Sequence, residues 1–428
     1  MTFNQVLEVI VVGAGMAGLG AAISCALAGH SVTVLEGVKE LAEVGAGLQI
    51  TPNGSRLLKV WSVDESLWKA AAEPTVLTVH RYDGTLLARE KNFDKNIREK
   101  YGHPFIDLHR VDLQKALYSR AVELGVKFHM NERVSSVDFS GPVVTTISGV
   151  QYSADLIVGA DGLWSRTREC FLGAADSPKP TGDLAYRIVL TLDQVKDPAL
   201  RRWISEPEVH FWIGASAHAV GYSLRSGEMY NIVLLVPDDL PAGVSKQAGN
   251  VDEMKQLFAE WDPVFQQFLH HVTKVEKWKL MHRDELPSWT NEVNFLMIGD
   301  SCHPMLPYLA QGANSSLEDG AALGTILKHF TTKEELPKAL RLYEELRHAR
   351  SETVVRETFR QRDDFHMPDG LQQQARDAIF LSQLDKQITG AFPSRWTCPI
   401  VQPWLYGYDA IEEAEKAVHK AKNEEFLS

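Results

Sequence analysis

Three glycines near the start of the chain have the spacing GxGxxG, and an acidic residue follows them at the end of the next apolar run. The glycines are Gly13, Gly15 and Gly18, and the acid is Glu36. Glycines at this spacing permit a tight turn, let the backbone approach a pyrophosphate and allow close packing of a helix whose N-terminus attracts phosphates. A carboxylate at that strand end accepts hydrogen bonds from ribose hydroxyls. Residues 7–36 therefore predict a strand–turn–helix–strand unit that binds an adenine dinucleotide.

A second segment, residues 296–320, has the same order of strand, loop and helix. Its apolar strand ends at Gly299-Asp300, and Gly312-Ala313-Asn314 opens a helix rich in alanine and leucine. Between the two units, an Asp161-Gly162 turn follows another short apolar strand. Three strand ends of this kind can converge on one ligand, and a helix N-terminus favours a ligand group that carries negative charge.

The three motifs stand in the order found in the class A flavoprotein monooxygenases, the FAD-dependent aromatic hydroxylases typified by p-hydroxybenzoate and salicylate hydroxylases. The chain closely resembles this family, and nearly the whole chain resembles its salicylate hydroxylase-like branch. Further matching segments are Gly45 to Gln49, His109 to Leu113, Ala185 to Arg187 and Trp404 to Ala410. The resemblance implies an α/β fold with a Rossmann-like FAD-binding domain, interleaved with a mostly antiparallel β-sheet substrate domain and followed by C-terminal helices.

The resemblance also implies which residues bind FAD. Glu36 is expected at the adenosine ribose, Arg110 at the pyrophosphate, and Asp300 at the ribityl or pyrophosphate region. Asp161 is expected at the cofactor as well, although an Asp-Gly turn needs no ligand to explain it. These four side chains extend the contacts that the glycine turn makes through its backbone.

The flavin ring is expected beside two further segments. Backbone N–H groups of Gly312, Ala313 and Asn314 are expected near the isoalloxazine, where a reduced flavin carries negative charge. Gln49 lies in the family's flavin-adjacent stretch, and a polar residue satisfied at a strand end explains it nearly as well. His303 stands where relatives often have a histidine, and we interpret it as a loop-stabilising residue without a catalytic role.

The family's chemistry implies a small aromatic substrate, O₂, and NADH or NADPH as a transient electron donor. Reduced FAD and O₂ form a C4a-hydroperoxyflavin, which delivers an electrophilic oxygen to an electron-rich ring. A phenol reacts far better as its phenolate, yet an unperturbed phenol titrates near about 10. A site that uses this route therefore benefits from a cation or from hydrogen-bond donors.

Three candidate catalytic residues follow from the resemblance. Arg187 occupies the family's aromatic-Arg strand position, and in some fungal relatives that arginine binds a substrate phenolate together with a tyrosine that matches Tyr222. His218, four residues earlier, matches a family histidine and is the candidate acid or base. The segment lacks the family's proline before His218, and Ser223 replaces the usual proline after Tyr222. A surface ion pair, a core aromatic and a structural histidine are the alternatives for the three residues.

Several outcomes of the reaction stay open from the sequence. Ortho hydroxylation, hydroxylation with loss of a carboxylate, and dearomatisation or epoxidation of a biosynthetic intermediate all use the same oxidant. An FAD protein that serves as a redox partner or binding module is the runner-up from another class. A dehydrogenase that binds NAD without a flavin leaves the Gly299-Asp300 unit unexplained.

Composition excludes several other classes of protein. The chain has 428 residues and a formal charge of −12, without the long basic cluster that nucleic-acid binding requires. Its four cysteines lie far apart, which predicts neither a metal site nor a redox pair and fits a reducing compartment. No basic residue precedes the uncharged stretch at residues 9–29, so we expect no integral membrane segment. We predict a cytoplasmic monomer or homodimer.

The predicted organisation is interleaved rather than linear. Short strands are expected at residues 210–212, 219–224 and 230–236, and amphipathic helices at 333–364 and 410–424. The FAD-binding domain is predicted to contain residues 1–75, 101–180 and 276–345. The substrate sheet is predicted from residues 76–100 and 181–275, and residues 346–428 form the C-terminal helical region.

Overall fold

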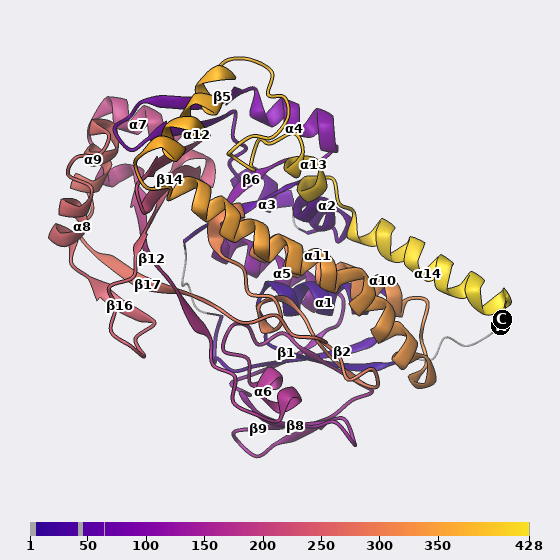
Figure 1. Ribbon diagram of the computed structural model, residues 1–428. Coiled ribbons are helices and arrows are strands. Elements are labelled where there is room, and N and C mark those ends of the chain that lie inside the picture. Colours follow the sequence, from indigo (N-terminus) through magenta and orange to yellow (C-terminus); the bar gives the residue numbers. More distant parts are fainter. Residues whose placement is uncertain (1–5, 42–45, 64, 428) are drawn as a thin grey trace.

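The computed structural model describes residues 6–41, 46–63 and 65–427. Gly45, part of one matching segment, lies outside the described residues. The first layer is a five-stranded parallel sheet in the order β18-β11-β1-β2-β7 (Figure 1). Its strands are β1 (Glu8–Val12), β2 (Ser31–Glu36), β7 (Lys127–Met130), β11 (Leu156–Gly159) and β18 (Phe295–Met297). Buried β-branched residues in β1 and β2 account for their position at the centre of the sheet.

Two helices that follow strands of this sheet pack side by side. They are α1 (Met16–Leu27) and α10 (Gln311–Leu327). A Cβ on Gly320 would lie 2.5 Å from the backbone of Gly20, and one on Gly324 would lie 2.5 Å from the backbone of Ser24. Because these contacts advance in the same direction along both helices, α1 and α10 run parallel. Their N-termini therefore point to the same end of the sheet.

The second layer is an eight-stranded sheet in the order β16-β17-β12-β15-β14-β13-β4-β5, antiparallel except for the β13–β4 pair. Its strands are β4 (Val76–Arg81), β5 (Leu86–Lys91), β12 (Lys179–Thr191), β13 (Glu208–Gly214), β14 (Ala217–Leu224), β15 (Met229–Pro237), β16 (Lys246–Gly249) and β17 (Val275–His282). One face packs through an aromatic core on α7 (Pro198–Ser205), α8 (Val251–Leu257) and α9 (Pro263–His270). Residues of alternate parity face the parallel-sheet layer.

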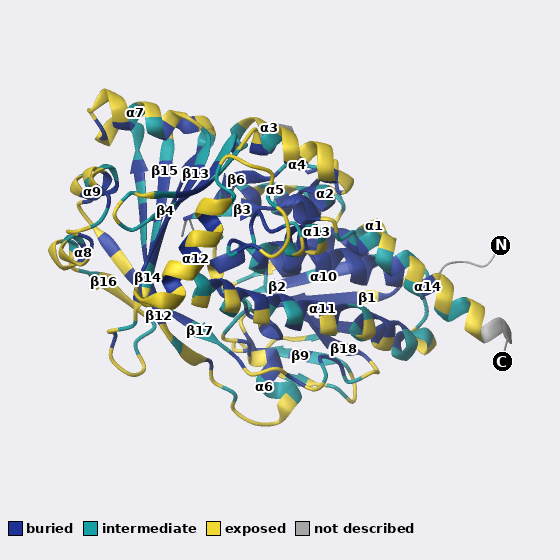
Figure 2. Cartoon of the chain, turned by 45° about the horizontal axis from the view of Figure 1, so that its top comes forward, coloured by how far each residue is buried: buried dark blue, intermediate teal, exposed yellow. Residues whose placement is uncertain are grey.

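Smaller elements join the two layers. The pair β3 (Gly47–Ile50) and β6 (Ile106–His109) lies between them, and β8 (Val134–Asp138), β9 (Val143–Thr146) and β10 (Gln151–Ser153) form a separate sheet. The earlier helices are α2 (Pro52–Val60), α3 (Glu65–Ala70), α4 (Phe93–Tyr101), α5 (Arg110–Glu123) and α6 (Arg166–Leu172). The later helices are α11 (Leu336–Phe365), α12 (Leu371–Ser382), α13 (Val401–Tyr406) and α14 (Ala410–Leu427). Figure 2 shows that α10 is almost wholly buried, whereas α7, α12 and α14 carry exposed residues.

The predicted fold class is confirmed, and two of the predicted domain boundaries need correction. The boundary at residue 276 falls inside β17, whose residues pair with β12, so this strand belongs to the eight-stranded sheet. The boundary at residues 345–346 falls inside α11, which continues unbroken because its hydrophobic contacts extend along both sides of that point. The three predicted short strands and both predicted C-terminal helices are present, with ends that differ by a few residues.

No helix in the described ranges has both the length and the apolar character needed to cross a membrane.

Candidate cofactor and substrate site

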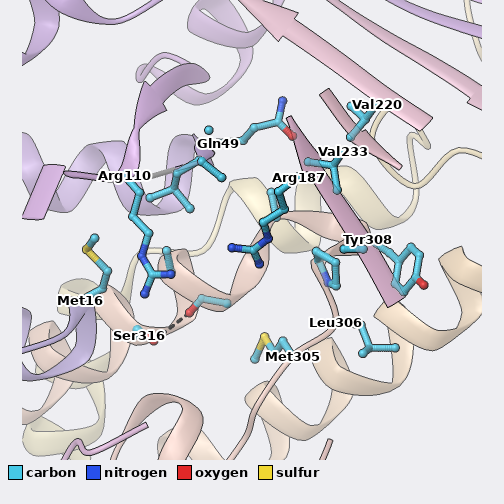
Figure 3. A pocket seen from close by; sticks show the side chains of 18 of the residues that line it. Met16, Gln49, Arg110, Arg187, Val220, Val233, Met305, Leu306, Tyr308 and Ser316 are labelled. Atoms are coloured by element: carbon cyan, nitrogen blue, oxygen red, sulfur yellow. Dashed lines mark hydrogen bonds between the residues drawn. The ribbon is translucent and has the colours of Figure 1, made fainter. Parts of the chain in front are cut away.

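A cavity of about 330 Å³ lies where the parallel-sheet layer, the eight-stranded sheet and α10 meet (Figure 3). Its volume is within the range of about 300–1,000 Å³ that is usual for ligand sites. A surface groove lies beside β2 and is lined by residues that include Glu36 and Trp164. It shares Gly15, Ala160 and Gly162 with the cavity. The two spaces together therefore suit a long ligand with one end on the surface and the other inside.

The glycine turn has the geometry that its spacing predicts. Gly13 has φ +107°, and a Cβ on this residue would lie 2.5 Å from the carbonyl oxygen of Ala160. A Cβ on Gly18 would lie 1.9 Å from the carbonyl oxygen of Gly13. Gly15, at the N-terminus of α1, lines the cavity, and apart from its chain neighbours no described residue has an atom within 4 Å of its Cβ position. Two of the glycines therefore serve chain packing, and Gly15 leaves room for a ligand.

Charged side chains border the same two spaces. The Glu36 carboxylate accepts hydrogen bonds from the backbone N–H of Ala14 (2.7 Å) and of Val38 (2.9 Å), which fixes it at the edge of the groove. Asp300 follows the end of β18 and is exposed at the cavity. Arg110 begins α5 and extends into the cavity in Figure 3.

The N-terminus of α10 provides a second cradle. Gly312 and Ala313 line the cavity, and outside the helix itself no atom of the described part of the chain lies within 4 Å of the Cβ position of Gly312. The Asn314 side chain points elsewhere: its Oδ1 accepts from the Thr51 N–H (3.1 Å), and its Nδ2 donates to the carbonyl of Gln49 (3.2 Å). Asn314 therefore fixes β3 against α10, while the backbone at the start of the helix stays open to a ligand.

The residues at these two helix N-termini fit a dinucleotide that ends in a flavin. Gly15 and Gly312 leave two cradles open, and the parallel packing of α1 and α10 directs both positive helix ends toward one space. Arg110 adds a cation at the same cavity. Among the described residues no group of three His, Cys, Asp or Glu side chains is arranged to hold a metal ion.

Asp161 is explained by the turn that it closes. One carboxylate oxygen, Oδ1, accepts hydrogen bonds from the Ser165 and Thr167 hydroxyls, both at 2.6 Å, and Oδ2 accepts from backbone N–H groups. The N–H donors to Oδ2 are those of Arg166 (2.7 Å) and Thr167 (2.9 Å). The carboxylate thus caps α6, which agrees with the alternative interpretation, and a cofactor contact for Asp161 stays a prediction.

Strand register brings the candidate substrate residues to one face of the large sheet. Arg187 on β12 is paired with Val233 on β15, which is paired with Val220 on β14. Because residues two apart share a face, His218 and Tyr222 lie on the same face as Val220. Arg187, Tyr222 and His218 all line the cavity, together with apolar residues of the same strands.

The Arg187 guanidinium extends into the cavity without a carboxylate partner among the described residues (Figure 3). It stacks on the Trp278 ring at 4.8 Å. Burial and the nearby Arg110 lower the pKa of Arg187, yet a guanidinium remains charged in proteins. The alternative of a surface ion pair does not describe it. Arg187 is a cation available to a ligand.

Tyr222 is a neutral donor beside this cation. Burial raises the pKa of Tyr222 well above its ordinary value, Asp107 adds to this effect, and Arg187 opposes it. A Cβ on Gly47 would lie 2.6 Å from the Tyr222 hydroxyl oxygen, so only glycine fits at that position of β3. A further buried pair joins β3 to β6. The Gln49 amide donates to the Asp107 carboxyl at 2.9 Å, and burial raises the pKa of Asp107 well above its usual range.

His218 is buried and contacts a second histidine. Its Nδ1 lies 2.7 Å from Nε2 of His366, which ends α11. Burial lowers the pKa of His218 well below its ordinary value, and His366 lowers it further. The imidazole is therefore neutral at pH 7.

A buried charge network behind α10 was not expected from the sequence. Asp319 accepts from the Gly299 N–H (2.8 Å), from His303 (2.6 Å) and from Arg347 (2.9 Å). Arg347 also pairs with Glu318 at 2.8 Å. The network fixes the loop that carries Asp300 and gives His303 the structural position that we expected. Two adjacent acids inside an otherwise uncharged helix are the sequence signal for such a network.

Comparisons with known proteins agree with this geometry. A family model for an FAD binding domain matches residues 6–358. The FAD-dependent monooxygenase OpS4 of Beauveria bassiana is 48% identical over 427 residues, which cover 98% of this chain and 99% of the relative. The 3-hydroxybenzoate 6-hydroxylase of Polaromonas naphthalenivorans is 29% identical, with 94% of this chain and 96% of the relative covered. A solved salicylate hydroxylase substrate complex is 21% identical, covers 97% of this chain and 99% of its own, and superposes with a TM-score of 0.79.

Proposed function

Since this chain belongs to the class A flavin-dependent monooxygenases, we propose that it uses FAD, O₂ and NADH or NADPH to hydroxylate a small phenolic or aromatic acid substrate. The observation that carries the proposal is a pair of donors, Arg187 and Tyr222, on a wall of the cavity whose other side chains, apart from His218, are apolar. A guanidinium and a neutral phenol together suit an anionic oxygen, either a phenolate or a carboxylate.

The wall around this pair suits an aromatic ring. Val220, Val233 and Leu235 come from adjacent strands and face the same space. A flat ring buries its faces against such side chains while its anionic oxygen accepts hydrogen bonds from Arg187 and Tyr222. The donors orient the ring and stabilise the ionised form, which is the electron-rich form that an electrophilic oxygen attacks.

The residues of the two cradles hold the cofactor in this proposal. Backbone N–H groups at Gly15 receive the pyrophosphate, and those at Gly312 and Ala313 face the flavin. Arg110, at the start of α5, and Asp300, after the end of β18, line the same cavity. FAD supplies the oxygen-transferring chemistry when bound, and the chain supplies position, charge and exclusion of water.

His218 is proposed as the base that accepts the phenol proton. Its Nδ1 is engaged by His366, and its Nε2 makes no hydrogen bond with a described residue. A neutral imidazole with a free nitrogen at a cavity wall accepts a proton from a donor placed beside it. After this proton transfer the substrate is a phenolate, which Arg187 stabilises.

The test begins with the visible spectrum of the purified protein. NADH and then NADPH oxidation is measured in the same cuvette with a panel of phenols and hydroxybenzoates that includes salicylate and 3-hydroxybenzoate. We expect flavin bands and substrate-stimulated oxidation that yields one oxygenated product per nicotinamide. Oxidation without an oxygenated product would favour a non-hydroxylating FAD protein, and a dearomatised or epoxidised product would favour that variant of the same chemistry.

A further inference from the structure

The two histidines in contact behind the cavity come from different parts of the fold. His218 lies on β14 and lines the cavity, whereas His366 ends α11 and lines a separate surface groove. The contact joins Nδ1 of His218 to Nε2 of His366 at 2.7 Å. The carbonyl of His366 accepts from the backbone N–H of Ser216 at 2.9 Å, which fixes the second ring beside the strand. One side-chain pair thus spans the wall between the cavity and the groove.

Charged groups surround the outer histidine. Nδ1 of His366 lies 4.0 Å from the carboxylate of Asp183 on β12. Asp183 is itself held by Arg362 of α11 at 2.5 Å and by the Tyr308 hydroxyl at 2.6 Å. Asp183 and Arg362 both line the groove. The carboxylate is near enough to stabilise a transient imidazolium, although the separation is too long for a direct hydrogen bond.

An imidazole ring has a nitrogen on each side, so it can accept a proton at one and release a proton from the other. A contact of 2.7 Å between two neutral imidazoles requires one shared proton, because two lone pairs or two N–H groups would repel each other. Burial lowers the pKa of both rings, that of His366 to about 4. A proton received by His218 is therefore not retained there.

We propose that His218 and His366 form a proton path from the substrate cavity to the surface groove, with His366 as the relay residue that acts through His218. This inference rests on the proposed function, since it concerns the proton that an aromatic hydroxyl loses on binding. It explains why His218 faces a second histidine rather than a carbonyl or carboxylate that would only fix its ring.

The proton balance closes without another reagent. The O–H bond of the phenol breaks and its proton binds Nε2 of His218, while the electron pair stays on the phenolate oxygen beside Arg187. The proton on Nδ1 of His218 passes to Nε2 of His366, and the proton on Nδ1 of His366 passes to water in the groove. Reorientation or back-exchange of the rings restores the starting tautomers.

The experiment uses the oxidised holoenzyme without nicotinamide, so that no turnover occurs. The protein is mixed with 3-hydroxybenzoate, and in a second series with salicylate, in weak buffer that contains a pH-indicator dye. Stopped-flow absorbance follows the phenolate band and the release of protons to solvent. In His366→Phe we expect both rates to fall at least about tenfold, with the equilibrium affinity, the FAD content and the final extent of ionisation unchanged.

A second variant separates proton transfer from structure. In His366→Ala, imidazole added to the solvent is expected to restore the ionisation rate, whereas His366→Phe, which fills the space, is not rescued. Gln372→Ala is the matched control, because Gln372 is exposed in the same groove and the ionisation rate should stay at the wild-type value.

The outcomes distinguish the two proposals. If wild-type protein ionises a hydroxybenzoate and His366→Phe does so at the same rate, the proton path is wrong and the proposed function stands. If the variants lose affinity or FAD and imidazole restores nothing, His366 is structural and the path is again overturned. If the wild-type protein ionises neither compound, the proposed substrate class fails and the inference fails with it.

Discussion

At the scale of single residues, the informative feature of the cavity is the environment of two polar side chains, Arg187 and Tyr222. Arg187 stacks on Trp278 and has no carboxylate partner among the described residues, while Tyr222 is held neutral by burial. An unpaired cation is costly in an apolar wall unless a ligand compensates it. The two side chains are therefore interpreted as groups kept for a substrate rather than for the fold.

Replacing Arg187 by Met is expected to lower kcat/KM about 10²-fold, because truncating one partner of a buried charge pair costs roughly 2–5 kcal/mol. The flavin absorbance per protein should not change, since Arg187 comes from the eight-stranded sheet and not from the glycine turn or the N-terminus of α10. Arg187→Lys, the control, keeps the charge without the planar fork and should lose less activity. Wild-type turnover in Arg187→Met would show that the substrate anion binds elsewhere.

Tyr222→Phe removes a neutral donor to a charged oxygen, which is worth about 1.5–3 kcal/mol. We expect kcat/KM to fall about tenfold or more at unchanged FAD content. Tyr230→Phe is the matched control, because Tyr230 lies on the neighbouring strand, faces the opposite side and accepts a hydrogen bond from Trp203. That variant should lose stability in urea and keep its kcat/KM, and the reverse pattern would exclude Tyr222 from the mechanism.

At the scale of elements, the decisive feature is the parallel packing of α1 and α10. Glycines at the contact let the two backbones approach closely, and this fixes both helix N-termini at one cavity. Behind α10, the pairs of Arg347 with Glu318 and Asp319 connect α11 to the same helix. The cofactor site thus depends on helix packing as much as on the loops that face the ligand.

Gly15→Val and Gly18→Val should fail in different ways. At Gly15 the backbone is extended (φ −76°, ψ −174°) and no described residue other than its chain neighbours is near, so the variant should fold and lose FAD because the new side chain occupies the proposed pyrophosphate site. At Gly18 the new Cβ meets the Gly13 carbonyl, which should lower the unfolding free energy by about 3 kcal/mol. Flavin absorbance and urea unfolding separate the two effects, and retention of FAD by Gly15→Val would contradict the assignment.

Arg347→Ala leaves Glu318 and Asp319 buried without their shared cation. Burial alone would raise the pKa of Asp319, but His303 and Arg347 outweigh it and lower that pKa to about 2. Removing one partner of such a buried pair costs about 3–5 kcal/mol. Arg341→Ala on the same helix breaks a half-exposed pair with Glu292 and should cost about 1 kcal/mol or less. Equal urea midpoints for the two variants would refute the structural role of the network.

At the scale of the whole molecule, the site is built from segments that are far apart in the chain. The cavity takes residues from β3, β12, β14, β15 and the N-termini of α1, α5 and α10. Stretches of sequence that lie far apart in the chain therefore have to pack before substrate and cofactor can meet. This arrangement also buries several histidines in their neutral form.

Folding stability should consequently fall as the pH is lowered from about 6.5 to 4.5. Burial lowers the pKa of His80 and His366 to about 4, whereas the unfolded chain binds these protons near about 6.5. The unfolded state then holds more protons, so each histidine lowers the unfolding free energy by up to about 3 kcal/mol across this window. Urea unfolding at several pH values measures the slope. His80→Gln should make it shallower by nearly one proton, and a flat profile in the wild type would contradict the burial argument.

Much of this organisation could be predicted from the sequence because it depends on local patterns. The GxGxxG spacing with Glu36 defined the dinucleotide unit, and alternation of apolar residues located the strands that contain Trp212, Tyr222 and Val233. The order of the three motifs led to the family and hence to FAD. Two predicted domain boundaries fell inside strand β17 and inside α11. Sequence pattern does not say which sheet a strand joins or where a long helix passes between layers.

The sequence by itself determined the cofactor and the order of the elements, since a backbone turn and a helix N-terminus bind phosphate through atoms close together in the chain. Only the tertiary structure decided that Asp161 is engaged by its own helix, that Arg187 forms no ion pair with a described residue, and that His218 meets His366. Those properties depend on which side chains of distant segments come within a few ångströms of each other. Burial and pairing are set by that packing, because a charge or a hydrogen bond is satisfied by its neighbours in space and not by its neighbours in sequence.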